Sequence, residues 1–589
     1  MIKWYCAGYG RFTGRKDGHM VKTVGIGNQD FEDIITNDIF YIDKTHFIKA
    51  WWENQDSVTL ITRPRRFGKT LCMSMLEKFF SVEYKDRGDL FQGLAIWDEP
   101  QYRKLQGTYP VISLTFANVK EDNYQMTKER IYQLIIELYN KNVFLLDSGL
   151  LTDEEVKYFR SISMDMPETT ATLAIYNMSS FLSRYYGRKV IILLDEYDTP
   201  MQEAYVNGFW DALTAFTRSL FNAAFKTNPY MERAIMTGIT RVSKESIFSD
   251  LNNLVVVTTT SKLYSDCFGF TEDEVFQALD IYGLSDQKQA VKDWYDGFSF
   301  GPCGDIYNPW SILNYLKLNQ FDTYWANTSS NILVAKLIRE SSRDIKIDFE
   351  NLLRGGCLNT QVDEQVVYNE LDSDESAIWS FLLAAGYLKV NGSSTDERGT
   401  TIYELKLTNW EVHLMFEKMV RSWFRSSMSN YNDFIKALLL GDVDAMNEYM
   451  NEVSQTIFSY FDTGRQPSKK ARPERFYHGF VLGLMVDLAD KYRISSNRES
   501  GFGRYDIVLE PRKENLDAVI IEFKVFNPKR ESSLKAAAEA ALKQIRSMDY
   551  AAALRDRGIP DDRIRSYGFA FDGKKVLIIS SIQHSEMMI

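Results

Sequence analysis

The segment from Val58 to Met75 reads VTLITRPRRFGKTLCMSM and constrains the fold of this chain more than any other stretch. Its β-branched, apolar start predicts a strand that stops at Arg63, and Gly68 opens a run with helical apolar spacing. A strand, a short loop and a helix in this order present backbone N–H groups that can hold phosphates. The segment therefore predicts an α/β fold in which a doubly wound parallel sheet carries a P-loop.

The residues Gly68-Lys69-Thr70 carry the expected chemistry of this loop. Lys69 is predicted to reach the β- and γ-phosphates of a nucleotide, and the Thr70 hydroxyl is predicted to ligate magnesium. The pattern departs from the usual one, because Arg63 stands where a glycine is expected and Pro64 has no N–H to offer. The alternative is that GKT merely starts a surface helix.

Three acids follow the continuous apolar run VIILLDEYDTP after Lys189. Such a run fits a parallel strand covered on both faces, and ligands bind at the carboxyl end of such strands. We expect Asp195 to hold magnesium, directly or through water, and Glu196 to orient and polarise the attacking water. Asp198 is a weaker candidate. The alternative is a solvated strand end without a catalytic role.

The next buried strand, Glu232 to Ile239, ends in polar residues. Thr237 is predicted to contact the phosphate or the water, and Arg241 is predicted to neutralise charge on the γ-oxygens. The alternative is that threonine only caps the strand end. Arg241 acts either on its own nucleotide or on a neighbour's, and only the second case requires a homo-oligomer.

Length and composition bound the class of protein. A chain of 589 residues with 45% hydrophobic residues is expected to form several packed domains. Scattered cysteines and the lack of a membrane-spanning or signal-peptide run predict a cytoplasmic protein without a membrane partner. The net charge of -11 argues against a generally basic surface but leaves a local nucleic-acid groove open. Residues 1–19 are expected to be a disordered tail or a mis-annotated extension before Met20.

The middle of the chain is expected to be helical, with the segment from Trp294 to Pro302 forming an aromatic turn that serves packing. Between Ser376 and Val420 the expected order is helix, strand, a turn at Asn391-Gly392, strand and helix. This order is typical of a winged-helix module. Such modules contact DNA or pack on an ATPase, and the acidic residues around this one favour packing.

A second group of candidate residues lies near the C-terminus. Asp506 is expected on a strand, and Glu522 and Lys524 alternate on the next one, so their side chains share a face. Asp506 and Glu522 are candidate metal ligands that hold a divalent ion against a phosphate, and Lys524 is placed to position or activate water. The pattern is weak by itself, since acids and lysines are abundant.

Three further residues are candidate accessories of this centre. Glu474 lies on the preceding predicted helix, His478 follows one turn later, and Gln544 belongs to a helix expected over 532–554. The alternative for His478 is a core or capping role. The order helix, strand with Asp, strand with Glu-x-Lys, helix, strand, strand is that of a PD-(D/E)XK nuclease core.

The chain resembles the bacterial AAA-ATPase-like proteins that carry a C-terminal PD-(D/E)XK nuclease domain. The resemblance covers nearly everything from Met20 on and rests on IGNQDFEDII, YIDKT, TRPRRFGKT, LLDEYDTP, TGITRVSKESIFSDLNN, WYDGFSF, ERFYHGF, GRYDIVLE and IEFKV. The form TRPRRFGKT is specific to that group and explains the missing glycine. Arg66 in this loop is therefore included among the predicted nucleotide-binding residues.

The resemblance implies ATP and Mg²⁺ as cofactors and a nucleic-acid partner, with DNA favoured over RNA. The first hypothesis is an enzyme in which ATP binding and hydrolysis control phosphodiester cleavage by the C-terminal domain, and the resemblance implies a role in defence or mobile-element biology. The alternative is a nucleotide-gated signalling scaffold whose nuclease-like domain binds nucleic acid or a partner without cutting. The expected domains are the extension 1–19, an ATPase domain 20–265, a helical lid 266–370, a winged-helix-like and helical connector 371–461, and a nuclease-like domain 462–589.

Overall fold

The chain divides into two compact units. The computed structural model describes residues 15–16, 19–20, 22–240, 247–248, 251–326, 328, 332–341, 343–363, 375–396, 399–425, 428–457, 481, 485, 488, 491–496, 499–500, 503–504, 506–513, 516–573 and 575–581. Unit 1 comprises Met1–Leu337 and Gly355–Met415, and unit 2 comprises Ile338–Arg354 and Phe416–Ile589. Each unit has its own sheets, which are described separately below.

A five-stranded parallel sheet forms the centre of unit 1, as the sequence predicts. Its strands are β3 (Val58–Thr62), β4 (Val111–Thr115), β5 (Val190–Asp195), β6 (Met231–Gly238) and β7 (Leu254–Val257), in the order β4-β5-β6-β3-β7. Thr62 of β3 lies opposite Gly238 of β6, so the carboxyl ends of these neighbouring strands meet at one edge of the sheet. The polar residues after β5 and β6 therefore face the start of the loop after β3.

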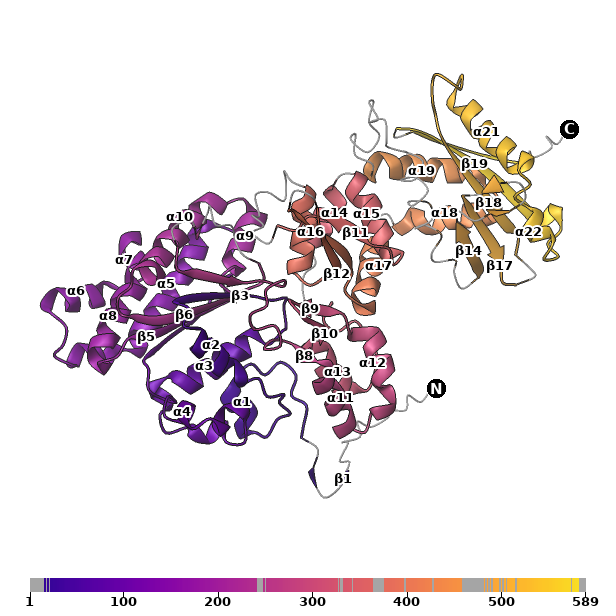
Figure 1. Ribbon diagram of the computed structural model, residues 1–589. Coiled ribbons are helices and arrows are strands. Elements are labelled where there is room, and N and C mark those ends of the chain that lie inside the picture. The colour runs from indigo at the N-terminus through magenta and orange to yellow at the C-terminus, as the bar shows by residue number, and fades with distance from the viewer. Residues whose placement is uncertain are drawn as a thin grey trace, which may run out of the picture. The chain divides into compact units, whose positions relative to one another are not determined.

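Helices cover both faces of this sheet (Figure 1). On one side lie α1 (Phe31–Thr36), α2 (His46–Asn54), α3 (Lys69–Phe80) and α4 (Pro100–Arg103), and on the other lie α5 (Tyr124–Lys141), α8 (Ala174–Tyr186) and α10 (Trp210–Phe221). The remaining helices of this region are α6 (Asp153–Ser161), α7 (Glu168–Thr172) and α9 (Thr199–Asn207). Side chains of α1, α2 and α3 share one buried core with Ile61, Ile191 and Ile235 of the strands. Cover on both faces explains why these strands are continuously apolar.

The region after the sheet is helical but also contains strands that were not predicted. Helices α11 (Glu272–Ile281), α12 (Lys288–Tyr295) and α13 (Pro309–Leu318) accompany an antiparallel sheet of β8 (Phe270–Thr271), β10 (Cys303–Tyr307) and β9 (Phe298–Phe300). The prediction of an aromatic turn was wrong for Phe298–Phe300, which pairs with β10. Two rings of this strand pack on Phe67 in the loop between β3 and α3, so the packing role agrees with expectation.

The predicted order helix, strand, strand, helix is present over residues 375–425. Helix α16 (Glu375–Ala384) is followed by β12 (Leu388–Thr395), β13 (Thr401–Leu407) and α17 (Trp410–Arg425), and β13 also pairs with β11 (Leu358–Thr360). The predicted turn at Asn391-Gly392 was wrong. Gly392 lies in β12 where the register shifts, and the chain reverses only after β12, where Asp396 accepts the Thr400 amide. A bulge accommodates the glycine without reversing the chain.

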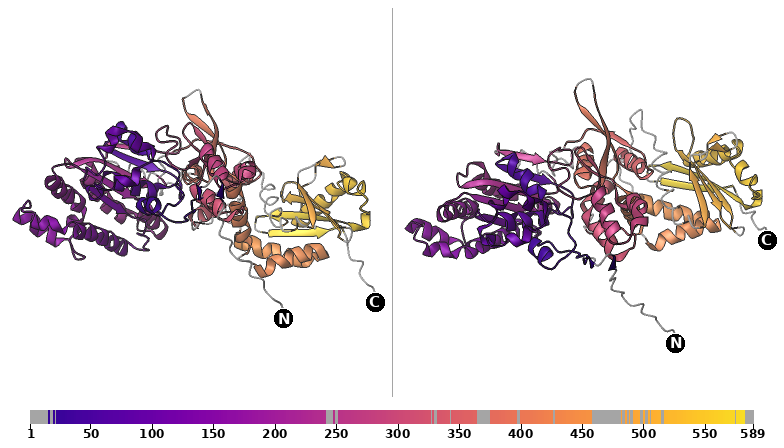
Figure 2. Two further views of the ribbon diagram at one scale, coloured as in Figure 1. Left: turned by 90° about the horizontal axis from the view of Figure 1, so that it is seen from below. Right: turned by 60° about the horizontal axis from the view of Figure 1, so that its bottom comes forward.

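Unit 2 contains a mixed sheet whose order is β14-β17-β18-β19-β20. Its strands are β14 (Tyr492–Ser496), β17 (Ile507–Pro511), β18 (Ala518–Val525), β19 (Ile564–Asp572) and β20 (Lys575–Ser580), and β18 and β19 run parallel. The helices α18 (Met428–Leu440) and α19 (Val443–Ile457) pack on one face of the sheet, and α21 (Leu534–Ser547) packs on the other (Figure 2). This is the mixed α/β unit that the sequence predicts.

One local prediction in unit 2 was wrong, and one strand was not predicted. The helix expected over 532–554 is two helices, α21 and α22 (Ala552–Arg555), because Asp549 between them has a positive φ of 50°. Strand β14 was not predicted, since it is a short edge strand with few apolar residues.

The other helices and strands of the chain lie outside the sheets described above. They are α14 (Ile332–Glu340), α15 (Arg343–Leu353) and two strand pairs, β1 (Arg15–Lys16) with β2 (His19–Met20) and β15 (Glu499–Ser500) with β16 (Gly503–Arg504). Within the described ranges, no helix is long and apolar enough to cross a bilayer.

Candidate functional site

The loop that connects β3 to α3 is the predicted phosphate loop, residues 63–68. Lys69 is the first residue of α3, and its amine contacts this loop. Gly68 precedes α3 with a φ of 80°, a left-handed conformation that glycine adopts without strain. The Nζ atom of Lys69 donates hydrogen bonds to the carbonyl oxygens of Arg63 (2.8 Å) and Pro64 (2.9 Å). Burial lowers the pKa of the Lys69 ammonium group, and the charge of Glu196 opposes that shift. The amine is therefore fixed beside the N-terminus of α3, where anions are stabilised.

The Asp195 carboxylate at the end of β5 accepts hydrogen bonds from two hydroxyls on two other elements. Its Oδ2 accepts a 2.7 Å hydrogen bond from Oγ1 of Thr70 on α3, and its Oδ1 accepts a short one from the Thr237 hydroxyl on β6. The Thr237 hydroxyl in turn accepts the backbone N–H of Glu196 at 3.1 Å. Burial raises the pKa of the Asp195 carboxyl, and the bonds from Thr237 and Thr70 oppose this shift. The structure thus brings together Thr70, Asp195, Glu196 and Thr237.

Glu196 and Asp198 differ in what their carboxylates contact. Glu196 has a positive φ of 49° and a partly exposed side chain, and it accepts the Thr199 hydroxyl at 3.3 Å. Oδ2 of Asp198 instead accepts the backbone amides of Ile239 (2.8 Å) and Thr240 (3.1 Å). Asp198 therefore fixes the segment after β6, whereas Glu196 remains available at the edge of the sheet.

Arg63 fills the position where the usual loop has a glycine. Its fully buried guanidinium donates to the carbonyl oxygens of Thr62 (2.8 Å) and Thr258 (2.7 Å) and lies 4.4 Å from the ring centroid of Phe300. The side chain therefore joins the loop to the segments after β7 and around β9. Sequence reasoning missed this role, although a charged residue directly after a buried strand was a usable signal.

Arg66 has an exposed side chain in the same loop. Its guanidinium lies 4.4 Å from the ring centroid of Trp310 on α13, and its backbone has a positive φ of 66°. A cation over an aromatic ring is held by electrostatic attraction. The structure places Arg66 beside α13, and its predicted contact with a nucleotide remains a prediction.

A cavity of about 100 Å³ lies next to Gly68. Its walls come from the chain before β3, from α3, from β8 with the loop before it, and from α13. They are mainly apolar and include Ile39, Tyr41, Leu71, Met75, Phe270 and Leu313. An apolar cavity beside a phosphate loop suits a flat, weakly polar group that is attached to phosphates.

The candidate residues of unit 2 gather on β18 and the elements around it. Asp506, just before β17, accepts the Phe523 backbone N–H at 2.8 Å, and Nζ of Lys524 lies 3.9 Å from Oε1 of Glu522. The Gln544 amide on α21 donates to the same Glu522 oxygen and to the Tyr550 hydroxyl at 3.0 Å. Glu522 is buried, and burial raises the pKa of the Asp506 carboxyl against the opposing effects of the Phe523 amide and Lys524.

Comparison with known proteins assigns both regions. Residues 25–248 match the family model described as predicted AAA-ATPase, and residues 472–581 match that of the PD-(D/E)XK nuclease superfamily. The chain combines an AAA-ATPase-like domain with a PD-(D/E)XK nuclease superfamily domain. An uncharacterized protein in the vnfD 5' region of Azotobacter chroococcum mcd 1 is 25% identical over 564 residues, which are 92% of this chain and 95% of that protein.

The donor atoms of both domains suit a divalent cation. In the AAA-ATPase-like domain, the Thr70 hydroxyl and the Asp195 carboxylate are 2.7 Å apart, and hydroxyl and carboxylate oxygens are the ligands that Mg²⁺ prefers. In the PD-(D/E)XK domain, the corresponding donors are the carboxylates of Asp506 and Glu522. Both sets are oxygen donors, as the sequence predicts for a hard cation.

Three predicted site residues have no structural account. Arg241, Glu474 and His478 lie outside the described residues.

Gln544, which was only an accessory candidate, makes the most direct contact with Glu522. Its position on the sheet-facing side of α21 became evident only once the crossover between β18 and β19 was known.

Proposed function

We propose that this protein is a magnesium-dependent P-loop ATPase whose nucleotide cycle controls phosphodiester cleavage by its nuclease-like domain. The observation that carries the proposal is the joining of Thr70, Asp195 and Thr237 by hydrogen bonds beside the phosphate loop. Such an arrangement serves a nucleotide site, because it collects oxygen donors where the N-terminus of α3 attracts phosphate.

In the proposed ATP site, Lys69, Thr70, Asp195 and Glu196 have separate roles. The Lys69 amine exchanges its contacts with the Arg63 and Pro64 carbonyls for oxygens of the β- and γ-phosphates. Thr70 and Asp195 hold magnesium, which neutralises charge on the phosphates when bound. Glu196 accepts a hydrogen bond from the attacking water and orients it toward the γ-phosphorus.

The cavity beside Gly68 supports a nucleotide rather than a simple phosphate as the ligand. It is lined mainly by apolar side chains and adjoins the helix that begins at Lys69. A purine base is a flat group whose faces are weakly hydrated, so burial in such a cavity adds affinity that phosphate contacts alone do not supply.

In the proposed nuclease centre, Asp506 and Glu522 hold a divalent cation that polarises the scissile phosphate when bound. Lys524 lies 3.9 Å from Glu522, close enough to orient a water toward phosphorus. Gln544 and Tyr550 keep the Glu522 carboxylate in one orientation. The substrate class is nucleic acid, and DNA is proposed over RNA. If Arg241 acts on the nucleotide of a neighbouring subunit, the protein must form a homo-oligomer.

A second candidate is a nucleotide-gated scaffold that binds nucleic acid or a partner without cutting. One observation favours it: both carboxylates of the centre already accept internal hydrogen bonds, Asp506 from the Phe523 amide and Glu522 from Gln544. A cation must therefore compete with these bonds. A role in defence or mobile-element processing follows only from the family resemblance and belongs to either candidate.

The two candidates are separated in one preparation of the full chain. Phosphate release and plasmid cleavage are measured with ATP, with ADP and without nucleotide, each with magnesium or with EDTA. The first proposal requires magnesium-dependent ATP hydrolysis and cleavage that differs between ATP and ADP. Hydrolysis without cleavage of plasmid, single-stranded DNA or RNA supports the scaffold. Absence of both nucleotide binding and hydrolysis overturns the proposed ATP site.

A further inference from the structure

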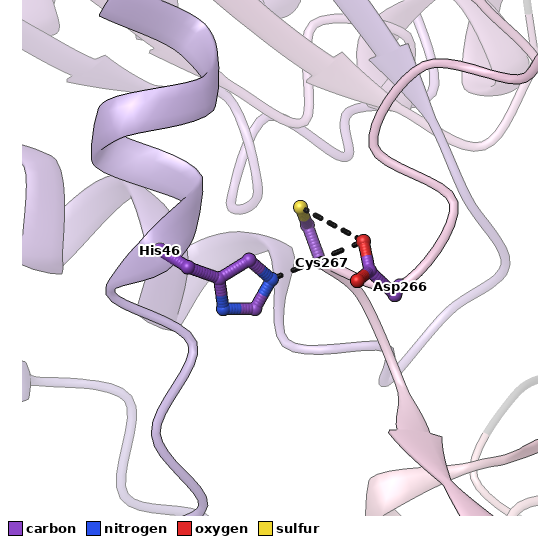
Figure 3. A group of neighbouring side chains, drawn as sticks. All are labelled: His46, Asp266 and Cys267. Carbon is purple, nitrogen blue, oxygen red and sulfur yellow. Dashed lines mark hydrogen bonds and ion pairs between the residues drawn. The ribbon is translucent and has the colours of Figure 1, made fainter. Parts of the chain in front are cut away.

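Three side chains whose types can ligate a metal lie together in unit 1 and are not among the residues proposed for the ATP site. His46 is the first residue of α2, and Asp266 and Cys267 are adjacent in the loop before β8. Figure 3 shows the imidazole facing the Asp266 carboxylate and the Cys267 thiol across a short gap. One donor atom from each residue lies within 4.8 Å of the other two.

The separations of the donor atoms are close to those of a metal site. Nε2 of His46 lies 3.9 Å from Oδ1 of Asp266, and Sγ of Cys267 lies 3.6 Å from the same oxygen. Tetrahedral zinc with its usual bond lengths separates N, O and S donors by about 3.3–3.6 Å. The Nε2–Oδ1 separation is about 0.3 Å longer than this range, and the Sγ–Oδ1 separation lies at its upper end.

The environment of each donor also suits a cation. The Nε2 atom of His46 is buried and makes no hydrogen bond within the described part of the chain, so its lone pair or proton is unsatisfied there. The Cys267 thiol is buried, whereas 58% of the Asp266 side chain is exposed and gives solvent access. Burial and Asp266 raise the pKa of the Cys267 thiol, so a cation must displace its proton in order to bind the sulfur.

We propose that His46, Asp266 and Cys267 bind a zinc-class divalent cation with three protein donors and one open position. Imidazole, carboxylate and thiolate together are a donor set that selects zinc over magnesium. On binding, the thiol proton leaves for solvent and a sulfur–metal bond forms, so the affinity rises with pH.

The proposed cation site lies beside the cavity next to Gly68, and its existence does not depend on the proposed ATP site. Cys267 also lines the cavity beside Gly68, and Nζ of Lys44 joins the Asp266 carbonyl (2.9 Å) to Glu274 (2.8 Å). A cation at this position links α2 to the loop that forms one wall of the cavity. The cation would therefore act as a cross-link near the cavity that is proposed to hold the purine base.

Cobalt(II) provides the test, because a cobalt–thiolate bond absorbs in the near ultraviolet and tetrahedral cobalt absorbs in the visible. The full chain without an affinity tag is titrated under reducing conditions in the absence of nucleotide. We expect one equivalent of cobalt to produce both bands, and zinc to abolish them by displacement.

Variants assign the bands to these residues. H46A and C267S should each lose the thiolate band or require at least tenfold more cobalt, whereas C357S and C6S should retain it. H46A changes a partly exposed side chain, so it tests the site even if C267S fails to fold. Absence of the bands in the wild-type chain, or their persistence in folded H46A and C267S, overturns the proposal. Because nucleotide is absent, neither result depends on the ATP site.

Discussion

The hydroxyl of Thr70 donates a 2.7 Å hydrogen bond to the Asp195 carboxylate, although 125 residues separate the two in sequence. Asp195 also accepts the Thr237 hydroxyl, whose oxygen accepts the Glu196 amide. Thr237 therefore orients the proposed magnesium ligand and the proposed water-orienting residue at the same time. A carboxylate held by two hydroxyls loses little freedom when it binds a cation.

Replacing Thr237 by alanine should separate ATP binding from hydrolysis. The variant keeps Lys69 and Thr70 but loses one of the two hydrogen bonds that orient Asp195, so we expect ATP hydrolysis to fall by about 10- to 100-fold with little change in ATP affinity. Steady-state phosphate release and isothermal titration measure the two effects. T214A is the control, because Thr214 is a buried threonine on α10 of the same domain. An equal loss of affinity and turnover would instead indicate that the fold of the site is damaged.

Lys69 should be essential for turnover. Its amine is predicted to stabilise charge on the β- and γ-phosphates, so K69A should lower ATP hydrolysis by at least about 100-fold. Circular dichroism must show that the variant is folded, since the change also leaves the Arg63 and Pro64 carbonyls without this donor. The exposed residue Lys85 supplies the control variant K85A. Persistent hydrolysis in K69A would show that the phosphate loop is misassigned.

The elements that local patterns encode were predictable, but their tertiary contacts were not. The strand, loop and helix around Lys69 follow from apolar spacing and from Gly68, and the sheet-edge position of Asp195 follows from the continuous apolar strand before it. The charge of Arg63 directly after a buried strand was a signal, but its contact with Thr258 was not predictable, because 195 residues separate the two in sequence. Asn391-Gly392 was mistaken for a turn because a local signal does not reveal that the strand continues through a bulge.

The same limit applies to Glu411, which no pattern singled out. It is fully buried at the start of α17 and accepts the Ser311 hydroxyl at 2.8 Å and the Trp325 and Ala326 amides at 2.5 and 3.3 Å. The Trp325 indole in turn donates to the carbonyl oxygen of Arg65 in the phosphate loop at 2.9 Å. Glu411 therefore supports a contact of the loop from a distance that sequence alone does not reveal.

Glu411 should make stability depend on pH. Burial raises its pKa from an ordinary value near 4.5 to about 7, despite the opposing hydrogen bonds. The folded state thus holds the proton more tightly than the unfolded state, so this contribution to stability is complete below pH 4.5 and is lost as the pH rises to about 7. Glutamine has the same shape and stays neutral. We expect E411Q to gain stability relative to wild type, on the order of 1–3 kcal/mol, between pH 5 and pH 8.

Denaturant unfolding of both proteins at pH 5 and pH 8 measures this difference. E154Q is the control, because 82% of the Glu154 side chain is exposed. If the free-energy difference between E411Q and wild type is the same at both pH values, the Glu411 carboxyl is not the titrating group.

Glu522 should be required for cutting but not for ATP hydrolysis. E522Q removes the negative charge of a proposed metal ligand with almost no change in volume, so magnesium-dependent plasmid cleavage should fall by at least about 100-fold. ATP hydrolysis by the same preparation should stay within twofold of wild type. E539Q is the matched control, since Glu539 is exposed on α21. Undiminished cleavage by E522Q would dismiss the nuclease centre.

Gln544 should position Glu522 without taking part in the reaction. Its amide donates to a Glu522 oxygen and to the Tyr550 hydroxyl, so Q544A frees the carboxylate to rotate and leaves all proposed ligands in place. Loss of such an outer contact typically weakens metal binding by about 10- to 100-fold. We therefore expect Q544A to need correspondingly more magnesium for half-maximal cleavage and to recover most of the wild-type rate when magnesium is saturating. K543A, which changes the preceding residue of α21, should leave the magnesium dependence unchanged. Cleavage that is lost at every magnesium concentration would make Gln544 part of the reacting centre, and an unchanged magnesium dependence would show that its contact with Glu522 has no role in metal binding.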